Sequence, residues 1–149
     1  LYCETILSEP FCLVCPATHR LARKRQVAWS DLAGQPLVLL DHASGSRRLI
    51  DRALADHAVQ CTVAQEVGHT TTIFRMLDAG LGISVIPTLA LPPEGLARLV
   101  VRPLVPRVDR DIVLVHRRNR ALPPVAQAAW DLVRAVAAQR LRGISQPSA

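Results

Sequence analysis

The sequence predicts an α/β fold in which a mainly parallel sheet is covered by helices on both faces. Apolar runs at 11–15 and 37–40 have the length and composition of strands that are buried on both sides. Between 68 and 87 an amphipathic helix is followed at once by a third apolar run, which Pro87 closes. A strand reached this tightly from a helix is typical of a parallel sheet with helices on its faces.

Apolar periodicity places strands and helices in alternation along the chain. Strands are expected at 11–15, 37–40, 62–67, 83–86, 96–101 and 111–116. A helix near 46–57 carries one apolar face, and the next helix is expected to begin with Thr70 as its cap. Gly80 lies where a helix ends in a left-handed residue, a conformation that glycine adopts without steric cost.

Polar and proline-rich segments connect these elements. We expect a basic loop at 18–26, a short helical turn at 31–33 capped by Ser30, and a proline-punctuated link at Pro103 and Pro106. A last helix begins at 123–124 and runs to about 141, where Gly143 stops it before a flexible tail at 143–149. Its expected core stripe is Val125, Ala129, Leu132 and Val136.

Composition limits the class of protein. The chain has 149 residues, half of them hydrophobic, which suits one folded domain of ordinary size. The net charge is +6, but the 17 arginines are scattered without aromatic neighbours, which favours a solvated surface over a DNA-reading face. The sequence lacks an apolar run of 18 residues and a secretory signal, so we expect no membrane contact, a cytoplasmic location and reduced cysteines.

Motifs that suggest catalysis or metal binding do not fit their contexts. Cys12 and Cys15 have C-x-x-C spacing, but residues three apart in a strand point to opposite faces, so two buried thiols are expected. The glycines at 80 and 82 follow a helix, whereas a dinucleotide loop precedes one. Asp41, His42 and Ser44 are adjacent in sequence, which is not triad geometry. We therefore predict no enzyme activity, no catalytic residues, no metal and no cofactor.

Two polar clusters stand where helices begin after buried strands. Ser44, Gly45 and Ser46 open the 46–57 helix, and His69, Thr70, Thr71 and Thr72 open the next one. Free N–H groups, the positive helix end and short hydroxyls can hold an anion, although helix capping is the commoner use of such residues. Because parallel strands bring both starts to one sheet edge, we predict an effector site there, with Arg47 as a possible added charge.

Several segments resemble the C-terminal effector-binding domain of LysR-type transcriptional regulators. Glu9-Pro10-Phe11-Cys12-Leu13-Val14-Cys15-Pro16 is similar to the family's EPLVLVLP, and Asp31-Leu32-Ala33-Gly34-Gln35-Pro36-Leu37 to its DLAxxPL. Ala79-Gly80-Leu81-Gly82-Ile83-Ser84-Val85-Ile86-Pro87 is similar to AGLGIALLP, and Leu122-Pro123-Pro124-Val125-Ala126 to LSPAA. The order and spacing of these segments carry the resemblance from about residue 4 to residue 140.

The resemblance implies a fold like that of type II periplasmic binding proteins, with an effector cleft between two α/β subdomains. Residues 1–10 would end the first subdomain, 11–110 would form the second, and 111–142 would return to the first, part of which is missing from this chain. The family implies a small-molecule effector, a homo-oligomer (dimer or tetramer), and DNA binding through an N-terminal helix-turn-helix outside this chain. A stand-alone solute-binding module of the same fold, or an enzyme on a related two-lobed fold, is the alternative.

Overall fold

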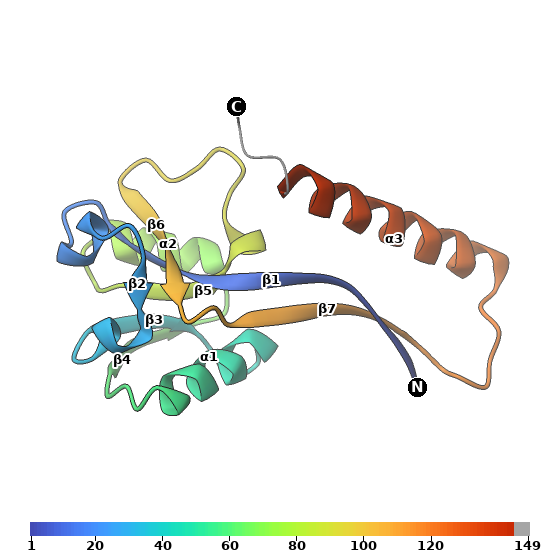
Figure 1. The fold of residues 1–149 in the computed structure, drawn as a ribbon, viewed down its shortest axis with the longest axis horizontal. Helices are drawn as coiled ribbons and strands as arrows, with labels where there is room; N and C mark the ends of the chain where they lie inside the picture. Colours follow the sequence, from blue (N-terminus) through green and yellow to red (C-terminus); the bar gives the residue numbers. More distant parts are fainter. Residues whose placement is uncertain (145–149) are drawn as a thin grey trace. The chain divides into compact units, whose positions relative to one another are not determined.

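The long strand β1 (Tyr2–Pro16) passes through both of the units into which the chain divides (Figure 1). The structure is a computed structural model that describes residues 1–144. Unit 2 comprises Glu9–Arg110, and unit 1 comprises Leu1–Ser8 together with the chain from Asp111 onward. Both boundaries fall inside strands: the first lies within β1 and the second within β7 (Asp109–His116). β7 pairs with β1.

Unit 2 contains most of the regular elements. In chain order they are β1, the 3₁₀ turn η1 (Arg20–Arg23), β2 (Val27–Ala28), η2 (Trp29–Leu32), β3 (Pro36–Leu40), α1 (Gly45–Asp56), β4 (Thr62–Val67), α2 (Thr70–Asp78), β5 (Ser84–Pro87), η3 (Thr88–Ala90) and β6 (Leu99–Val105). The strands and helices expected near 37–40, 46–57, 62–67, 70–80 and 83–86 are therefore present, with ends shifted by two residues at most.

Unit 2 combines parallel and antiparallel strand pairs. β3 pairs in parallel with β4, and backbone bonds from Ile83 to Pro36 and from Val38 to Ile83 place the start of β5 beside β3. β2 pairs in parallel with β6. β1 lies between β5 and β6 and runs antiparallel to both.

Helices cover this sheet on both faces. One hydrophobic cluster joins Leu13, Leu37 and Val85 to Ile50 and Leu54 of α1. A second cluster joins the alternate strand positions, among them Val14, Val38 and Ile86, to Ile73, Phe74 and Leu77 of α2. Successive strand residues point to opposite faces, so the continuous apolar runs fill both clusters and produce a three-layer α/β/α arrangement.

Unit 1 consists of the first half of β1, most of β7, and α3 (Pro124–Ile144). Trp130 of α3 donates from Nε1 to Glu4 Oε2 at 3.2 Å, and Arg134 Nε lies 2.8 Å from Glu4 Oε1. Tyr2, His116 and Trp130 form an aromatic group with ring centroids 5.0 to 6.1 Å apart. These contacts attach the Trp130 face of α3 to β1 and β7.

The predicted core stripe of α3 is wrong. Val125, Leu132 and Val136 are exposed, whereas Ala137 is buried. Apolar residues occupy both sides of this helix, so periodicity alone could not decide which side packs. The helix also continues through Gly143 to Ile144, beyond its predicted end, and the rest of the predicted tail, 145–149, lies outside the described residues.

Local predictions also needed correction in the connecting segments. The expected loop at 18–26 contains η1, and Ser30 lies inside η2, whose first turn is fixed by Asp31 Oδ2 accepting from Ala28 N at 2.9 Å. Pro103 lies within β6 opposite Cys12 instead of in a link. β1 begins nine residues before the predicted strand start at 11. Among residues 1–144, no helix combines the length and apolar character needed to cross a membrane.

Candidate functional site

The structure brings the two predicted polar clusters to one edge of the sheet. β3 and β4 are parallel, and each leads through a short turn into the helix that follows it. Asp41 N donates to Val67 O at 2.9 Å, so the two turns adjoin. A Cβ atom at Gly68 would lie 3.6 Å from Asp41 Oδ2, which shows the same closeness. The starts of α1 and α2 are therefore neighbours at the carboxyl ends of these strands.

The three residues of the cluster at the start of α1 differ in how deeply they are buried. Ser44 is the residue before the helix and is half-buried, and its side chain makes no capping bond. Gly45 is exposed. Ser46 is 5% exposed, and its Oγ accepts a hydrogen bond from Arg110 Nη1 at 2.8 Å. Ser46 thus has a fixed partner, while the Ser44 hydroxyl keeps its capacity for another.

The cluster at the start of α2 is more open. His69, and not the predicted Thr70, is the capping residue: it is extended at φ −136°, while Thr70 already has helical geometry. The His69 side chain makes no capping bond, so the first turn keeps free N–H groups. Thr71 and Thr72 are exposed, Thr70 is half-buried, and the described part of the chain shows no side-chain hydrogen bond from any of the three.

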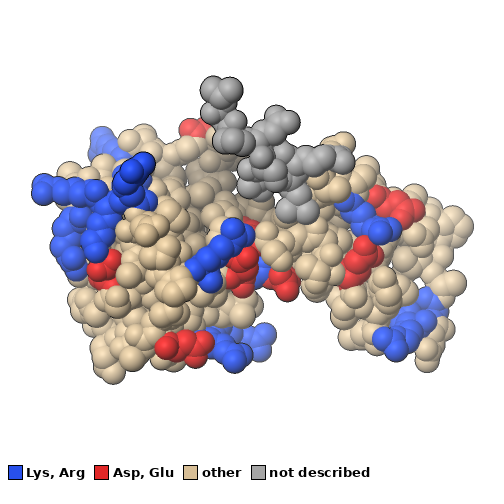
Figure 2. Space-filling model, viewed as in Figure 1, with Lys and Arg blue, Asp and Glu red and all other residues tan. Residues whose placement is uncertain are grey.

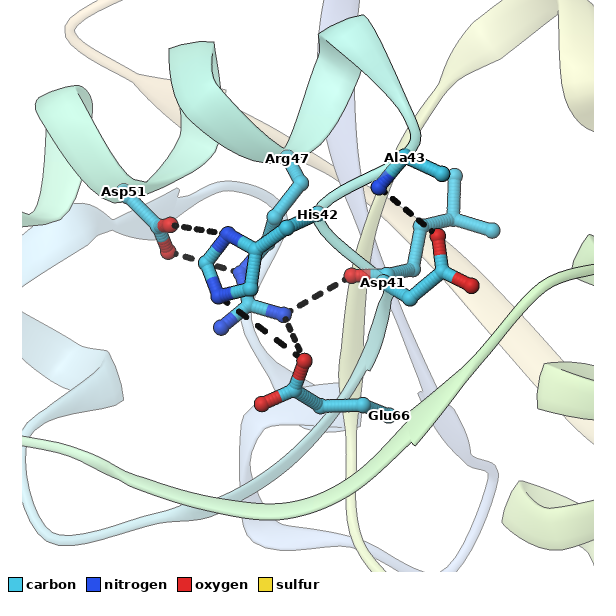
Figure 3. A network of polar contacts seen from close by, with 7 residues as sticks. Asp41, His42, Ala43, Arg47, Asp51 and Glu66 are labelled. Atoms are coloured by element: carbon cyan, nitrogen blue, oxygen red, sulfur yellow. Dashed lines mark hydrogen bonds and ion pairs between the residues drawn. The ribbon is translucent and has the colours of Figure 1, made fainter.

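Arg47 does not add charge to this edge, contrary to the suggestion from sequence. Figure 3 shows its guanidinium directed into a network with Asp51 and Glu66. Nε donates to Asp51 Oδ1 at 2.9 Å, and Nη1 contacts Glu66 Oε2 at 3.1 Å and Leu40 O at 2.8 Å. Burial lowers the pKa of Arg47, but the hydrogen bonds to both carboxylates outweigh it and raise the pKa above its usual value. Arg47 is a structural cation.

A second polar network was missed by sequence reasoning. Glu9 of β1 is 3% exposed, and its Oε1 accepts from Arg110 Nε at 2.5 Å. Its Oε2 accepts from Leu89 N at 2.5 Å and from Thr88 Oγ1 at 3.1 Å, at the start of η3. Through Arg110 and Ser46 the network reaches α1. These residues come from four separate segments, so no sequence spacing could have revealed them.

Unit 2 has a cavity beside the start of α2 and a second, apolar cavity between β1 and β6. One of about 470 Å³ lies beside α2 and is lined by Thr70, Thr71, Phe74 and the segment 90–97. Another of about 390 Å³ is mainly apolar and is lined by Phe11, Cys12, Val101 and Leu104, among others. The larger of these two is bordered by predicted site residues, and the apolar one is bordered by none of them.

Cys12 and Cys15 lie on opposite faces of β1, as predicted, because one belongs to the α2-side cluster and the other to the α1-side cluster. Burial, with a smaller contribution from Glu9, raises the pKa of Cys12 to about 12. Burial also raises the pKa of Cys15 and of Cys61. These thiols are protonated at neutral pH, which makes them poor nucleophiles and poor metal ligands. Within the described residues, no group of three His, Cys, Asp or Glu side chains is arranged to hold a metal ion.

Comparison with known proteins decides the family. The family model described as LysR substrate binding domain matches residues 1–138. The chain belongs to the LysR substrate-binding domain family. The HTH-type transcriptional regulator YfeR of Shigella flexneri is 53% identical over 135 residues, which cover 90% of this chain and 44% of that protein. YbhD of Escherichia coli strain K12, named likewise, is 35% identical over 86% of this chain and 41% of its own length.

Solved structures of LysR effector-binding domains share the fold. The regulatory domain of CcmR from Synechocystis PCC6803, in complex with 2-PG, has a TM-score of 0.83 at 22% identity, over 91% of this chain and 66% of that one. The effector-binding domain of QuiR with shikimate has a TM-score of 0.79 at 22% identity, over 92% and 66%. The LysR-domain chain therefore has the predicted fold, and it spans less than half the length of the curated relatives named above.

Proposed function

We propose that this chain is the effector-sensing part of a transcriptional regulator and that the starts of α1 and α2 bind a small acidic metabolite. The observation that carries the proposal is the juxtaposition of Ser44–Ser46 with His69–Thr72 at one sheet edge. Each start supplies N–H groups and a positive helix end, and the hydroxyls can orient a bound group. Two adjoining helix starts favour an anion more strongly than either would alone.

Other regulators of the family support the same kind of ligand. The CcmR and QuiR domains were solved with 2-PG and with shikimate, both small molecules. The relatives of this chain are named as regulators of transcription and not as enzymes or solute carriers. This favours a sensor over the stand-alone solute-binding module and over the two-lobed enzyme that the sequence left open.

The proposal assigns the rest of the regulator by family. Unit 2 corresponds to the second subdomain, expected at 11–110, and unit 1 to the flanking parts, 1–10 and 111–142, of the first. The effector would alter the arrangement of a homo-oligomer on DNA in the cytoplasm, with DNA held by a helix-turn-helix outside this chain. Basic side chains on the face shown in Figure 2 form separate groups, with acidic side chains near several of them, which fits DNA contact made elsewhere.

The test is the substitution Thr71→Ala in the complete regulator. Thr71 is exposed and is not the capping residue, so folding should change little. Loss of a hydrogen bond to a charged ligand should weaken binding by about 1–3 kcal/mol. Calorimetric titration with 2-PG, shikimate and inorganic phosphate measures this, and the probe that binds most tightly is used to compare the variants.

Thr62→Ala is the matched control. Thr62 is an exposed threonine at the opposite end of β4, so its loss should leave affinity unchanged. Equal affinities of wild type and Thr71→Ala would show that this threonine serves only the helix. A regulator that binds none of the three probes would contradict an anion site at this edge.

A further inference from the structure

The Ser46 hydroxyl is the most constrained polar group at the start of α1. It is 5% exposed, and Arg110 Nη1 donates to its oxygen at 2.8 Å. A guanidinium has only donors, so Arg110 cannot receive the Ser46 proton. Within the described residues, that proton has no hydrogen-bond acceptor among the side-chain contacts. The Ser46 hydroxyl therefore accepts from Arg110 and keeps its own proton to donate to a bound group.

Glu9 keeps Arg110 in this position. Its Oε1 accepts from Arg110 Nε at 2.5 Å, and its Oε2 is occupied by Thr88 and Leu89 at the start of η3. With both oxygens bonded and 3% of the residue exposed, the carboxylate has little freedom to move. Arg110 uses two donors in this network, and its side chain is 27% exposed, so its other N–H groups can meet a ligand.

The groups available to a ligand at the start of α1 are hydrogen-bond donors. The Glu9 and Arg110 charges cancel as a pair, so the local preference comes from hydrogen-bond direction more than from net charge. The Ser46 hydroxyl, the remaining Arg110 N–H groups and the first-turn N–H groups of α1 are all donors. A ligand group that also donates would leave buried donors without partners, which costs affinity.

We infer that the Glu9–Arg110 pair positions Ser46 as a donor and so restricts the effector at the start of α1 to a group that accepts hydrogen bonds, a carboxylate or a phosphate. This inference rests on the proposed function and adds positioning residues to its site. A purely structural ion pair would stabilise the fold without coupling to Ser46 in ligand binding. The two roles are therefore separable by experiment.

The experiment is a double-mutant cycle in the complete regulator. Wild type, Ser46→Ala, Arg110→Gln and the double variant are titrated calorimetrically with the tightest of 2-PG, shikimate and inorganic phosphate. Each single change should weaken binding about tenfold, the loss of one charge-assisted bond. The double variant should be no weaker than the worse single variant, because both changes remove the same donor arrangement.

Two further variants distinguish the position of the Arg110 donor from the effect of its positive charge. Arg110→Lys keeps a donor within reach of Ser46 and should recover part of the affinity lost in Arg110→Gln. Arg107→Gln is the matched control: Arg107 is an exposed arginine three positions earlier that pairs with Asp109, and its loss should leave affinity unchanged. Melting temperatures of all variants report any loss of folding, and Ser46→Ala keeps the test valid if Arg110→Gln does not fold.

Full ligand affinity in Ser46→Ala, or affinity losses that add in the double variant, would overturn the inference. The proposed function would stand in that case if Thr71→Ala still binds the ligand more weakly than wild type. Equal binding of shikimate and of its neutral amide would overturn the acceptor requirement. Failure of wild type to bind any of the three probes would contradict the proposed function, and the inference with it.

Discussion

At the scale of single residues, Arg47 and Arg110 show how two arginines near the same helix start differ. Arg47 is 4% exposed and satisfied by two carboxylates and a carbonyl, so it holds α1 to the ends of β3 and β4. His42 lies on the outside of this network, 3.9 Å from Asp51 and 3.8 Å from Glu66. Arg110 is more open and bonds Ser46. The two arginines therefore differ in role because their hydrogen-bond partners differ.

Arg47→Ala should lower the free energy of unfolding by about 2–3 kcal/mol. The change leaves Leu40 O without its donor and two carboxylates without their cation, although both carboxylates are partly exposed and so are partly rescued by water. Urea denaturation measures the difference. Arg52→Ala is the control: Arg52 is 82% exposed with a single 3.9 Å contact to Asp56, so its loss should cost less than about 0.5 kcal/mol. Equal costs would contradict the structural role of Arg47.

Sequence reasoning about residues was limited by what lies adjacent in the chain. The helix starts at 44–46 and 69–72 could be located because helix starts carry a local signature, and their role in binding stays a prediction. The role of Arg47 could not be predicted, because Arg47 can pair with a ligand or with Glu66. The position of Glu66 depends on β4, which comes later in the chain. Sequence reasoning could not find Glu9 and Arg110 at all, since their contact joins positions 101 residues apart.

At the scale of elements, the turn between α2 and β5 sets how β5 enters the sheet. Gly82 has φ +145°, and a Cβ atom there would lie 2.3 Å from Pro36 O. The same carbonyl accepts from Ile83 N at 3.0 Å. The close approach of the two backbones needs a residue without a side chain.

Gly82→Ala should cost about 3–5 kcal/mol, since backbone strain and a steric clash act together. Gly80→Ala is the matched comparison two residues earlier: its φ is +80°, but a Cβ there would meet nothing within 4 Å. Strain alone should cost about 1–2 kcal/mol. Denaturant midpoints of the two variants give the comparison. A Gly82→Ala protein as stable as Gly80→Ala would contradict the close packing of β5 on β3.

β3, β5, α1 and α2 could be predicted because these strands are continuous apolar runs and these helices have one apolar face. The antiparallel direction of β1 could not be predicted, because direction depends on which strands become neighbours. The packed face of α3 was predicted wrongly for another reason. Its apolar residues surround the helix, and the side that packs is chosen by Trp130 and by Arg134, which bind Glu4 of β1.

At the scale of the whole molecule, the chain belongs to the LysR substrate-binding domain family and divides into two units at residues 8/9 and 110/111. Glu9 and Arg110 are the first and last residues of unit 2, and Ser46 belongs to the same unit. A ligand held at the starts of α1 and α2 would therefore act next to the strands that run from one unit into the other.

The central claim is that the ligand is held by the starts of α1 and α2. Amide hydrogen exchange of the complete regulator, with and without the tightest of the three probes, tests it directly because it reports the N–H groups themselves. The account predicts slower exchange in 44–47 and 69–73 on binding, with little change in 92–97, which also lines the cavity beside α2. Protection confined to 92–97, or unchanged exchange in both helix starts under saturating ligand, would contradict it.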